Sequence, residues 1–268
     1  MNMYQLKVIP SEAQIRKFLR RTLFGKNVYC PECKSDKVCA RRNRYWCRSC
    51  RIWFSLLSHT WLSNLKLPLQ QFWMILWCWT TQVPIRQTVK LTMLSEVTIR
   101  HWFEQFRSQL PLEQGALEKL VQLDEAYFGG RQGITLLMGK QPGTRKLAYH
   151  ILPHTTPCKE HAWWFLQTFV EPGSDLHTDG GAIYNAIDQH WPVTHKRDIH
   201  KKFEFALTSE IEGIFGVLRT FIRRVYHHTS SDKLPSIVGE FCFRFSHPEI
   251  FENPRLFMEK TLKFASTR

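Results

Sequence analysis

Residues 120–130 read LVQLDEAYFGG, and residues 175–181 read DLHTDGG. In each stretch an aspartate, Asp124 or Asp179, follows a short apolar run and precedes two glycines at which the chain can turn. Short apolar runs bounded by glycine are typical of strands. Both acids are therefore expected at or near strand ends, the edge where α/β sheets build their sites. Taken alone, each acid has a simpler interpretation as a cap or a solvated charge.

A third acid lies in a helical pattern. Residues 209–224 read SEIEGIFGVLRTFIRR, in which Glu212 and Arg219 are seven positions apart and so share one face of the expected helix. Arg223 continues that face approximately, which puts cations for phosphate beside a carboxylate for metal. Carboxylates from two strand ends and a facing helix can converge on two divalent metal ions, and such a pair of ions suits in-line attack on a phosphodiester. The joint pattern predicts an enzyme that cuts or joins DNA.

The sequence around these acids alternates between strand and helix patterns. Four runs separated by Gly and Pro are expected as strands: KLVQLDEAYF, GITLLMGK, RKLAYHILPH and SDLHTDG. Three segments are expected as helices: HAWWFLQTFV, AIYNAIDQH and EIEGIFGVLRTFIRR. The order β-β-β-α-β-α predicts an α/β domain, a mixed sheet with flanking helices, over residues 116–250. Residues 251–268 are expected as a C-terminal tail.

A cysteine knuckle precedes this domain. Two CxxC pairs with thirteen residues between them supply four thiols: Cys30, Cys33, Cys47 and Cys50. Each pair can place two thiolates around one tetrahedral ion, so a single structural Zn²⁺ is expected in a ribbon over residues 25–60, after an N-terminal helix within residues 1–24. The alternative, two redox-active dithiols, lacks a surrounding thioredoxin-like pattern.

The knuckle is also basic and aromatic. Four arginines are the expected DNA contacts: Arg41, Arg42, Arg44 and Arg48. Together with Arg51 they alternate with Tyr45, Trp46 and Trp53, a mixture that suits phosphate contact and stacking on bases. A ribbon that only staples a small domain is the other interpretation.

Residues 61–115 form a helical segment in the same prediction. A helix over Ile85–Leu91, a turn at 92–94 and a second helix that starts with Ser95 as N-cap would make a helix-turn-helix. Arg100 then lies near the start of the recognition helix and is an expected DNA contact. Any helical hairpin can show this spacing, so the pattern is suggestive and not unique.

The charge of the chain points to a polyanion. The formal net charge is +14, and residues 1–60 hold thirteen Lys and Arg against three Asp and Glu, a difference of +10. Nucleic acid is favoured over a membrane as the partner, although the charge can also serve solubility alone. No secretory signal and no membrane-spanning apolar run is evident, so a cytoplasmic, nucleoid-associated location is expected.

Several short motifs, taken in order, resemble those of ISXO-like insertion-sequence transposases: LDEAYFGG, HTDGGAIY, IEGIFGVLR, VYHHTS and EFCFRF. The resemblance implies an RNase H-like catalytic domain behind a zinc ribbon and a helix-turn-helix-like segment. It assigns Asp124, Asp179 and Glu212 to the DDE triad and places Arg219 where the family usually has Lys. It further implies two Mg²⁺ or Mn²⁺ ions per active site, binding of terminal inverted repeats and target DNA, and a homo-oligomer on DNA.

The chain departs from that family at two positions, Ser209 and Ser246, where relatives often have Asn. Two rival functions remain open. One is a non-catalytic DNA-binding protein derived from a transposase, and the other is a metal-dependent nuclease that cuts without joining.

Overall fold

The computed structural model describes residues 9–111, 113–128, 133–153, 156–197, 208–227 and 229–265. The Gly129–Gly130 turn expected from the sequence lies outside these residues. The chain forms two compact units, one made of Met1–Phe103 with Glu249–Arg268 and the other of Glu104–Pro248. Among the described residues, no helix combines the length and the apolar character needed to cross a membrane.

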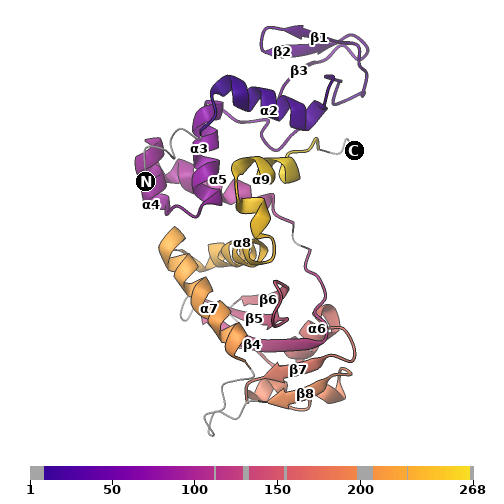
Figure 1. The fold of residues 1–268 in the computed structure, drawn as a ribbon, viewed down its shortest axis with the longest axis vertical. Coiled ribbons are helices and arrows are strands. Elements are labelled where there is room, and N and C mark those ends of the chain that lie inside the picture. The colour runs from indigo at the N-terminus through magenta and orange to yellow at the C-terminus, as the bar shows by residue number, and fades with distance from the viewer. Residues whose placement is uncertain are drawn as a thin grey trace. The chain divides into compact units, whose positions relative to one another are not determined.

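The first unit opens with a helix, α2 (Glu12–Phe24), whose first turn is closed by a capping box between Ser11 and Gln14. A three-stranded antiparallel sheet follows, made of β1 (Val38–Arg41), β2 (Arg44–Cys47) and β3 (Trp53–Ser55). The next elements are the helices α3 (Leu69–Thr80), α4 (Ile85–Thr92) and α5 (Glu96–Ser108), the last of which crosses the boundary between the units (Figure 1). The helices expected on either side of the 92–94 turn are therefore confirmed.

The C-terminal residues belong to the first unit as well. The tail expected at 251–268 contains a helix, α9 (Pro254–Thr261), which packs on α3 with the rings of Trp79 and Phe257 5.0 Å apart. Asn253 caps this helix by accepting backbone N–H groups, and the proline that follows suits the first helical turn. Part of the expected tail is thus a packed helix.

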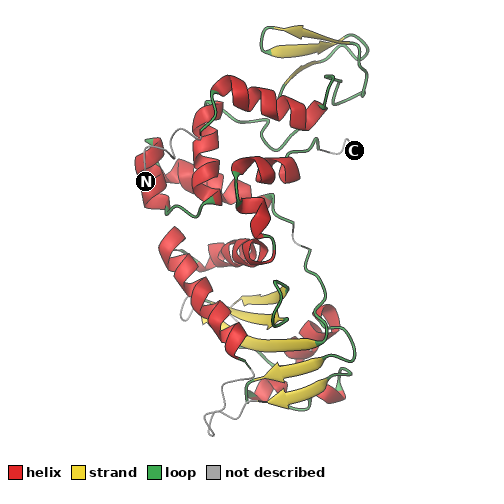
Figure 2. Ribbon diagram, viewed as in Figure 1, coloured by secondary structure: helices red, strands yellow, loops and turns green. Residues whose placement is uncertain are grey.

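The second unit is built on a five-stranded mixed sheet (Figures 1 and 2). Its strands are β4 (Leu120–Phe128), β5 (Ile134–Lys140), β6 (Leu147–Pro153), β7 (Asp175–Thr178) and β8 (Thr194–Arg197). They lie in the order β6-β5-β4-β7-β8. β5 runs antiparallel to both of its neighbours, β4 and β6, and β7 and β8 run parallel to β4. The helices are α6 (Lys159–Phe169), α7 (Ser209–Phe221) and α8 (Leu234–Ser246). The expected mixed α/β sheet with flanking helices is confirmed.

One expected helix is wrong. The segment AIYNAIDQH forms two short 3₁₀ turns, Ala182–Tyr184 and Ile187–Gln189, instead of one helix. Ala186 between them has φ +58°, a left-handed conformation that an α-helix excludes. Strand β8 was not expected either, because its polar residues show no alternating apolar pattern.

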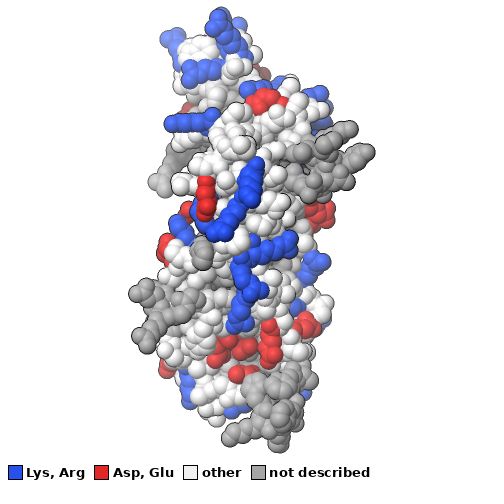
Figure 3. Space-filling view, turned by 90° about the vertical axis from the view of Figure 1, so that its left-hand side faces the viewer, with Lys and Arg blue, Asp and Glu red and all other residues white. Residues whose placement is uncertain are grey.

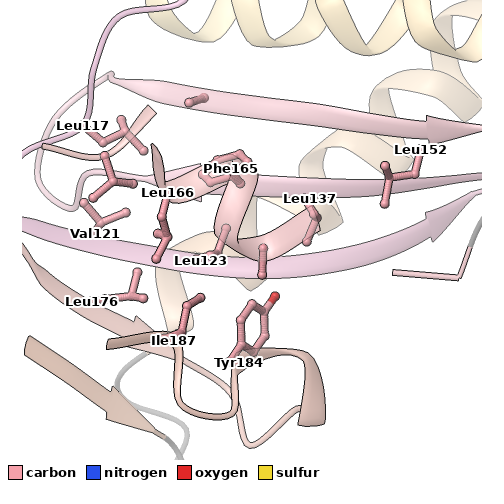
Figure 4. Close-up of a cluster of buried hydrophobic side chains, with 13 residues drawn as sticks. Leu117, Val121, Leu123, Leu137, Leu152, Phe165, Leu166, Leu176, Tyr184 and Ile187 are labelled. Carbon is pink, nitrogen blue, oxygen red and sulfur yellow. The ribbon is translucent and has the colours of Figure 1, made fainter. Parts of the chain in front are cut away.

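Two layers of helix enclose the sheet. On one face, α6 buries Phe165 and Leu166 against Leu123 and Leu137 (Figure 4). Neighbouring residues of a strand point to opposite faces, so Gln122, next to Leu123, faces the other layer, where it contacts α7. The candidate site therefore lies on the face of the sheet that α7 covers, at the ends of β4 and β7.

Candidate functional site

Two aspartates lie side by side where β4 and β7 pair. These strands run parallel with Leu123 opposite Thr178, and the next residue on each is an aspartate, Asp124 or Asp179. Asp179 Oδ1 accepts the backbone N–H of Gly181 at 2.9 Å, and a Cβ on Gly181 would lie 2.8 Å from the same oxygen. Glycine at this position therefore lets the backbone close on the carboxylate.

A further acid, Glu125, joins these two in a compact cluster. Ligand oxygens of Asp124, Glu125 and Asp179 all lie within 4.8 Å of one another. The buried Tyr184 donates a hydrogen bond to Glu125 Oε2 at 2.5 Å. Glu125 was not among the expected site residues, because strand alternation predicts that it faces away from Asp124. The available signal was its adjacency to Asp124.

The acids of the cluster are partly buried and close together, so each disfavours the ionisation of the others. Burial, followed by the charges of Glu125, Asp179 and Glu212, raises the pKa of Asp124 to about 7, although the backbone N–H of Glu125 opposes the shift. Burial also raises the pKa of Glu125, against the hydrogen bond from Tyr184. Carboxylate oxygens are the ligands that hard divalent cations prefer, and a bound cation would offset the mutual repulsion. The donor set fits Mg²⁺ or Mn²⁺.

Glu212 lies outside this compact cluster, on α7, but near enough for its charge to act on Asp124. Its side chain is exposed, and Oε1 accepts a hydrogen bond from Thr208 Oγ1 at 3.1 Å. Thr208 is the N-cap residue of α7, so this contact fixes the carboxylate near the start of the helix.

Two contacts hold the first turn of α7 against the sheet. Gln122 Oε1, buried on β4 two residues before Asp124, accepts the N–H of Ile211 at 3.0 Å. Glu210 forms an ion pair of 3.6 Å with the buried Lys140 of β5. The carboxylate of Glu210 is therefore engaged with β5.

Two arginines follow Glu212 along the chain. Arg219 lies on α7 and Arg223 on the π-helical turn that follows it (Ile222–Tyr226), and both are exposed. The guanidinium of Arg219 lies 5.4 Å from the ring centre of Phe128, the last residue of β4. Figure 3 shows Asp and Glu side chains gathered on one face of this unit, with Lys and Arg side chains beside them.

The four knuckle cysteines converge in the first unit. Their sulfurs lie within 4.8 Å of one another, with Cys30 to Cys50 and Cys33 to Cys47 each at 3.6 Å. Four thiolates about 2.3 Å from one tetrahedral ion lie about 3.8 Å apart, so the arrangement fits Zn²⁺. Cys39 is not in this group and accepts a hydrogen bond from Arg48.

The remaining predicted DNA contacts differ in their surroundings. The four ribbon arginines are all exposed on or beside β1 and β2: Arg41, Arg42, Arg44 and Arg48. Arg100 is paired with Glu96 within α5, at 2.7 Å. Two apolar side chains beside it are strongly exposed, Met93 at 87% and Val97 at 78%. Met93 lies in the turn between α4 and α5, and Val97 lies in the first turn of α5.

A match to one protein-family model supports the family resemblance. A search of curated proteins finds no match to the chain. Residues 116–246, which include the acidic cluster, α7 and α8, match the model of the ISXO2-like transposase domain. This stretch of the chain therefore belongs to the ISXO2-like transposase domain family.

Proposed function

We propose that this transposase binds the terminal inverted repeats of an insertion sequence and catalyses metal-dependent DNA cleavage and strand transfer. The observation that carries the proposal is the parallel register of β4 and β7, which sets Asp124 beside Asp179 within a domain of this family. Glu212 on α7 supplies the third acid of the proposed DDE triad, and its charge acts on Asp124.

The three acids are the proposed ligands of two Mg²⁺ or Mn²⁺ ions. When bound, such ions polarise the phosphodiester and stabilise charge on the attacking and leaving oxygens. Water attacks the phosphorus at the transposon end, the P–O bond to the leaving oxygen breaks, and a free 3′-hydroxyl remains. That hydroxyl attacks a phosphodiester of the target DNA in the same way. Arg219, with its exposed guanidinium, contacts a phosphate near the scissile bond and offsets its charge.

The other segments are proposed to bring DNA to this site. The mixed sheet with flanking helices supports an RNase H-like catalytic domain at residues 116–250. The helix within residues 1–24 leads into a zinc ribbon at 25–60 that presents exposed arginines to phosphates, and the helix-turn-helix-like segment at 61–115 reads base edges through the start of α5. Pairing of two DNA ends requires more than one copy of the protein, so a homo-oligomer on DNA is part of the proposal.

A cleavage assay tests the proposal. The substrate is DNA carrying the inverted repeats that flank the gene, with Mg²⁺ or Mn²⁺, and the variants are Asp179→Ala and Asp175→Ala. Asp175 is an exposed aspartate at the start of the same strand, and so controls for loss of charge. We expect metal-dependent nicking and joining that vanish only in Asp179→Ala. Specific binding without cleavage by the wild type would instead identify a DNA-binding relative, and cleavage without joined products a nuclease.

A further inference from the structure

A second feature of α7 lies beyond the acids. After Phe221 the helix widens into the five-residue π turn Ile222–Tyr226, and His227 follows at φ +55°. π turns and left-handed non-glycine residues both carry a conformational cost and cluster at functional sites. The wider turn alters the direction in which the following side chains leave the helix, so its geometric effect falls on Arg223 and His227.

These side chains line a hollow of about 210 Å³. Seven of the described residues line it: Phe128, Arg219, Ile222, Arg223, His227, Thr229 and Leu234. The hollow therefore lies between the end of β4 and the turn that follows α7. Phe128 is four residues after Asp124 on one strand, a separation of about 13 Å at about 3.3 Å per residue.

Three polar side chains of the hollow have no ion pair or hydrogen bond in the part of the chain that the structure describes. Neither Arg219 nor Arg223 forms an ion pair with any residue in the described part of the chain. The hydroxyl of Thr229 is buried and has no hydrogen-bond partner among the described residues. A buried hydroxyl without a partner is unfavourable, and unpaired guanidinium groups beside it attract an acceptor.

The chemistry of the lining selects an anion. Two guanidinium groups, a hydroxyl and an imidazole N–H are all donors, and no carboxylate is among the described residues that line the hollow. A metal ion has no suitable ligand set here. A nucleobase would need acceptors for its own donors, and the ring of Phe128 is already covered by Arg219. A phosphate, whose oxygens accept from every one of these groups, fits the hollow best.

We propose that this hollow binds a phosphodiester of the DNA strand about two to four nucleotides from the scissile bond. The spacing follows from the ~13 Å between Asp124 and Phe128 along β4 and from a rise of ~3.4 Å per nucleotide in duplex DNA, or more in an extended strand. This inference rests on the proposed function. It adds His227 and Thr229 to the DNA contacts and assigns the π turn the role of aiming Arg223. The hollow positions the strand, and the acids act on it.

Charge-neutral phosphate substitutions test the inference. Duplexes carrying a transposon end receive one methylphosphonate at a time at each of the first six positions on either side of the cleavage site. Binding is measured with Ca²⁺ by fluorescence anisotropy for the wild type, Arg223→Ala, Thr229→Val and Arg224→Ala. Arg224 is the matched control, since it is exposed on the same π turn but does not line the hollow.

We expect one position, two to four nucleotides from the cleavage site, at which the methylphosphonate weakens wild-type binding about tenfold. That effect should disappear in Arg223→Ala, shrink in Thr229→Val and persist in Arg224→Ala. The slope of log K against log salt should also fall by about 0.9 in Arg223→Ala, as for one lost phosphate contact.

Three outcomes would overturn the inference. A methylphosphonate effect that is equal in Arg223→Ala and in wild type would place the contact elsewhere, while normal wild-type binding and cleavage would leave the proposed function intact. Inorganic phosphate that competes with DNA in the wild type but not in Arg223→Ala, without a sensitive methylphosphonate position, would assign the hollow to a free anion. Failure of the wild type to bind transposon-end DNA at all would overturn both proposals.

Discussion

Replacing Asp124 by asparagine should stabilise the second unit in the absence of divalent metal. The folded-state pKa of Asp124, about 7, lies above the ordinary value of 3.8. Between these values the folded protein keeps a proton that the unfolded chain releases. The contribution of Asp124 is thus fully present below about pH 4 and is lost as the pH rises through about 7. A shift of about three pH units corresponds to at most about 4 kcal/mol, and partial exposure of the side chain reduces this toward about 2 kcal/mol.

The assay is amide hydrogen exchange of β4 between about pH 5 and pH 8.5, corrected for intrinsic exchange, because the two units need not unfold together. No strong chelator is used, since it would also strip the proposed zinc site. The advantage of Asp124→Asn over wild type should grow with pH and level off above about pH 8. Added Mg²⁺ or Mn²⁺ should stabilise the wild type by about 2.7 kcal/mol at a hundred times its Kd, and the variant far less.

The matched control is Asp175→Asn, an exposed aspartate on the strand that pairs with β4. It should show neither the pH-dependent gain nor the loss of metal response. If Asp124→Asn is no more stable than wild type at pH 8.5 without metal, the carboxylates do not repel one another as argued. If metal stabilises both proteins equally, the ions bind elsewhere.

Three further predictions concern other contacts. Glu240→Gln should destabilise the second unit by about 3–5 kcal/mol, because the buried Arg244 loses the counter-charge 2.8 Å away; a loss below about 1 kcal/mol in β4 exchange would contradict this. Cys33→Ser should lower the zinc content measured by atomic emission and leave β4 exchange unchanged, and full zinc content would exclude the four-cysteine site. Gln122→Met should cost about 1–3 kcal/mol in exchange of α7, because the N–H of Ile211 loses its acceptor, and should raise the Mg²⁺ concentration needed for cleavage; an unchanged requirement would contradict it.

The fold could be predicted where hydrophobic patterning is strong. The runs that became β4, β5, β6 and β7 are apolar and bounded by turn residues, so their type was evident. The segment 182–190 failed because its apolar spacing suits a helix, whereas Ala186 adopts a left-handed conformation that no local signal demands. The edge strand β8 failed for the opposite reason, since its polar residues show no apolar period and its place beside β7 depends on backbone pairing and on tertiary contacts such as the His195–Thr178 hydrogen bond.

The site was predictable only in part, because residue types are visible in a sequence and distances are not. Glu125 adjoins Asp124, yet it enters the cluster through contacts made at the edge of the sheet, including the hydrogen bond from Tyr184, 59 residues away. The hollow beside Phe128 depends on a π turn, and periodicity predicted only an uninterrupted helix through Arg224. In each case tertiary contact decides a geometry that local pattern leaves open.

The three proposed catalytic acids are held in different ways. An effect on metal binding can therefore be told apart from a general loss of stability. The last register pair of β4 and β7, Leu123 with Thr178, directly precedes Asp124 and Asp179, so backbone pairing places these two acids. Glu212 depends instead on the side-chain contacts that hold the first turn of α7, of which the Gln122 hydrogen bond is the most buried. Gln141→Met is a suitable comparison, because Gln141 is also buried and also accepts a backbone N–H, that of Glu118 and not that of an α7 residue. Both variants should lose similar stability, and only Gln122→Met should change the metal requirement, because the Gln122 hydrogen bond holds the first turn of α7 on the strand that carries Asp124.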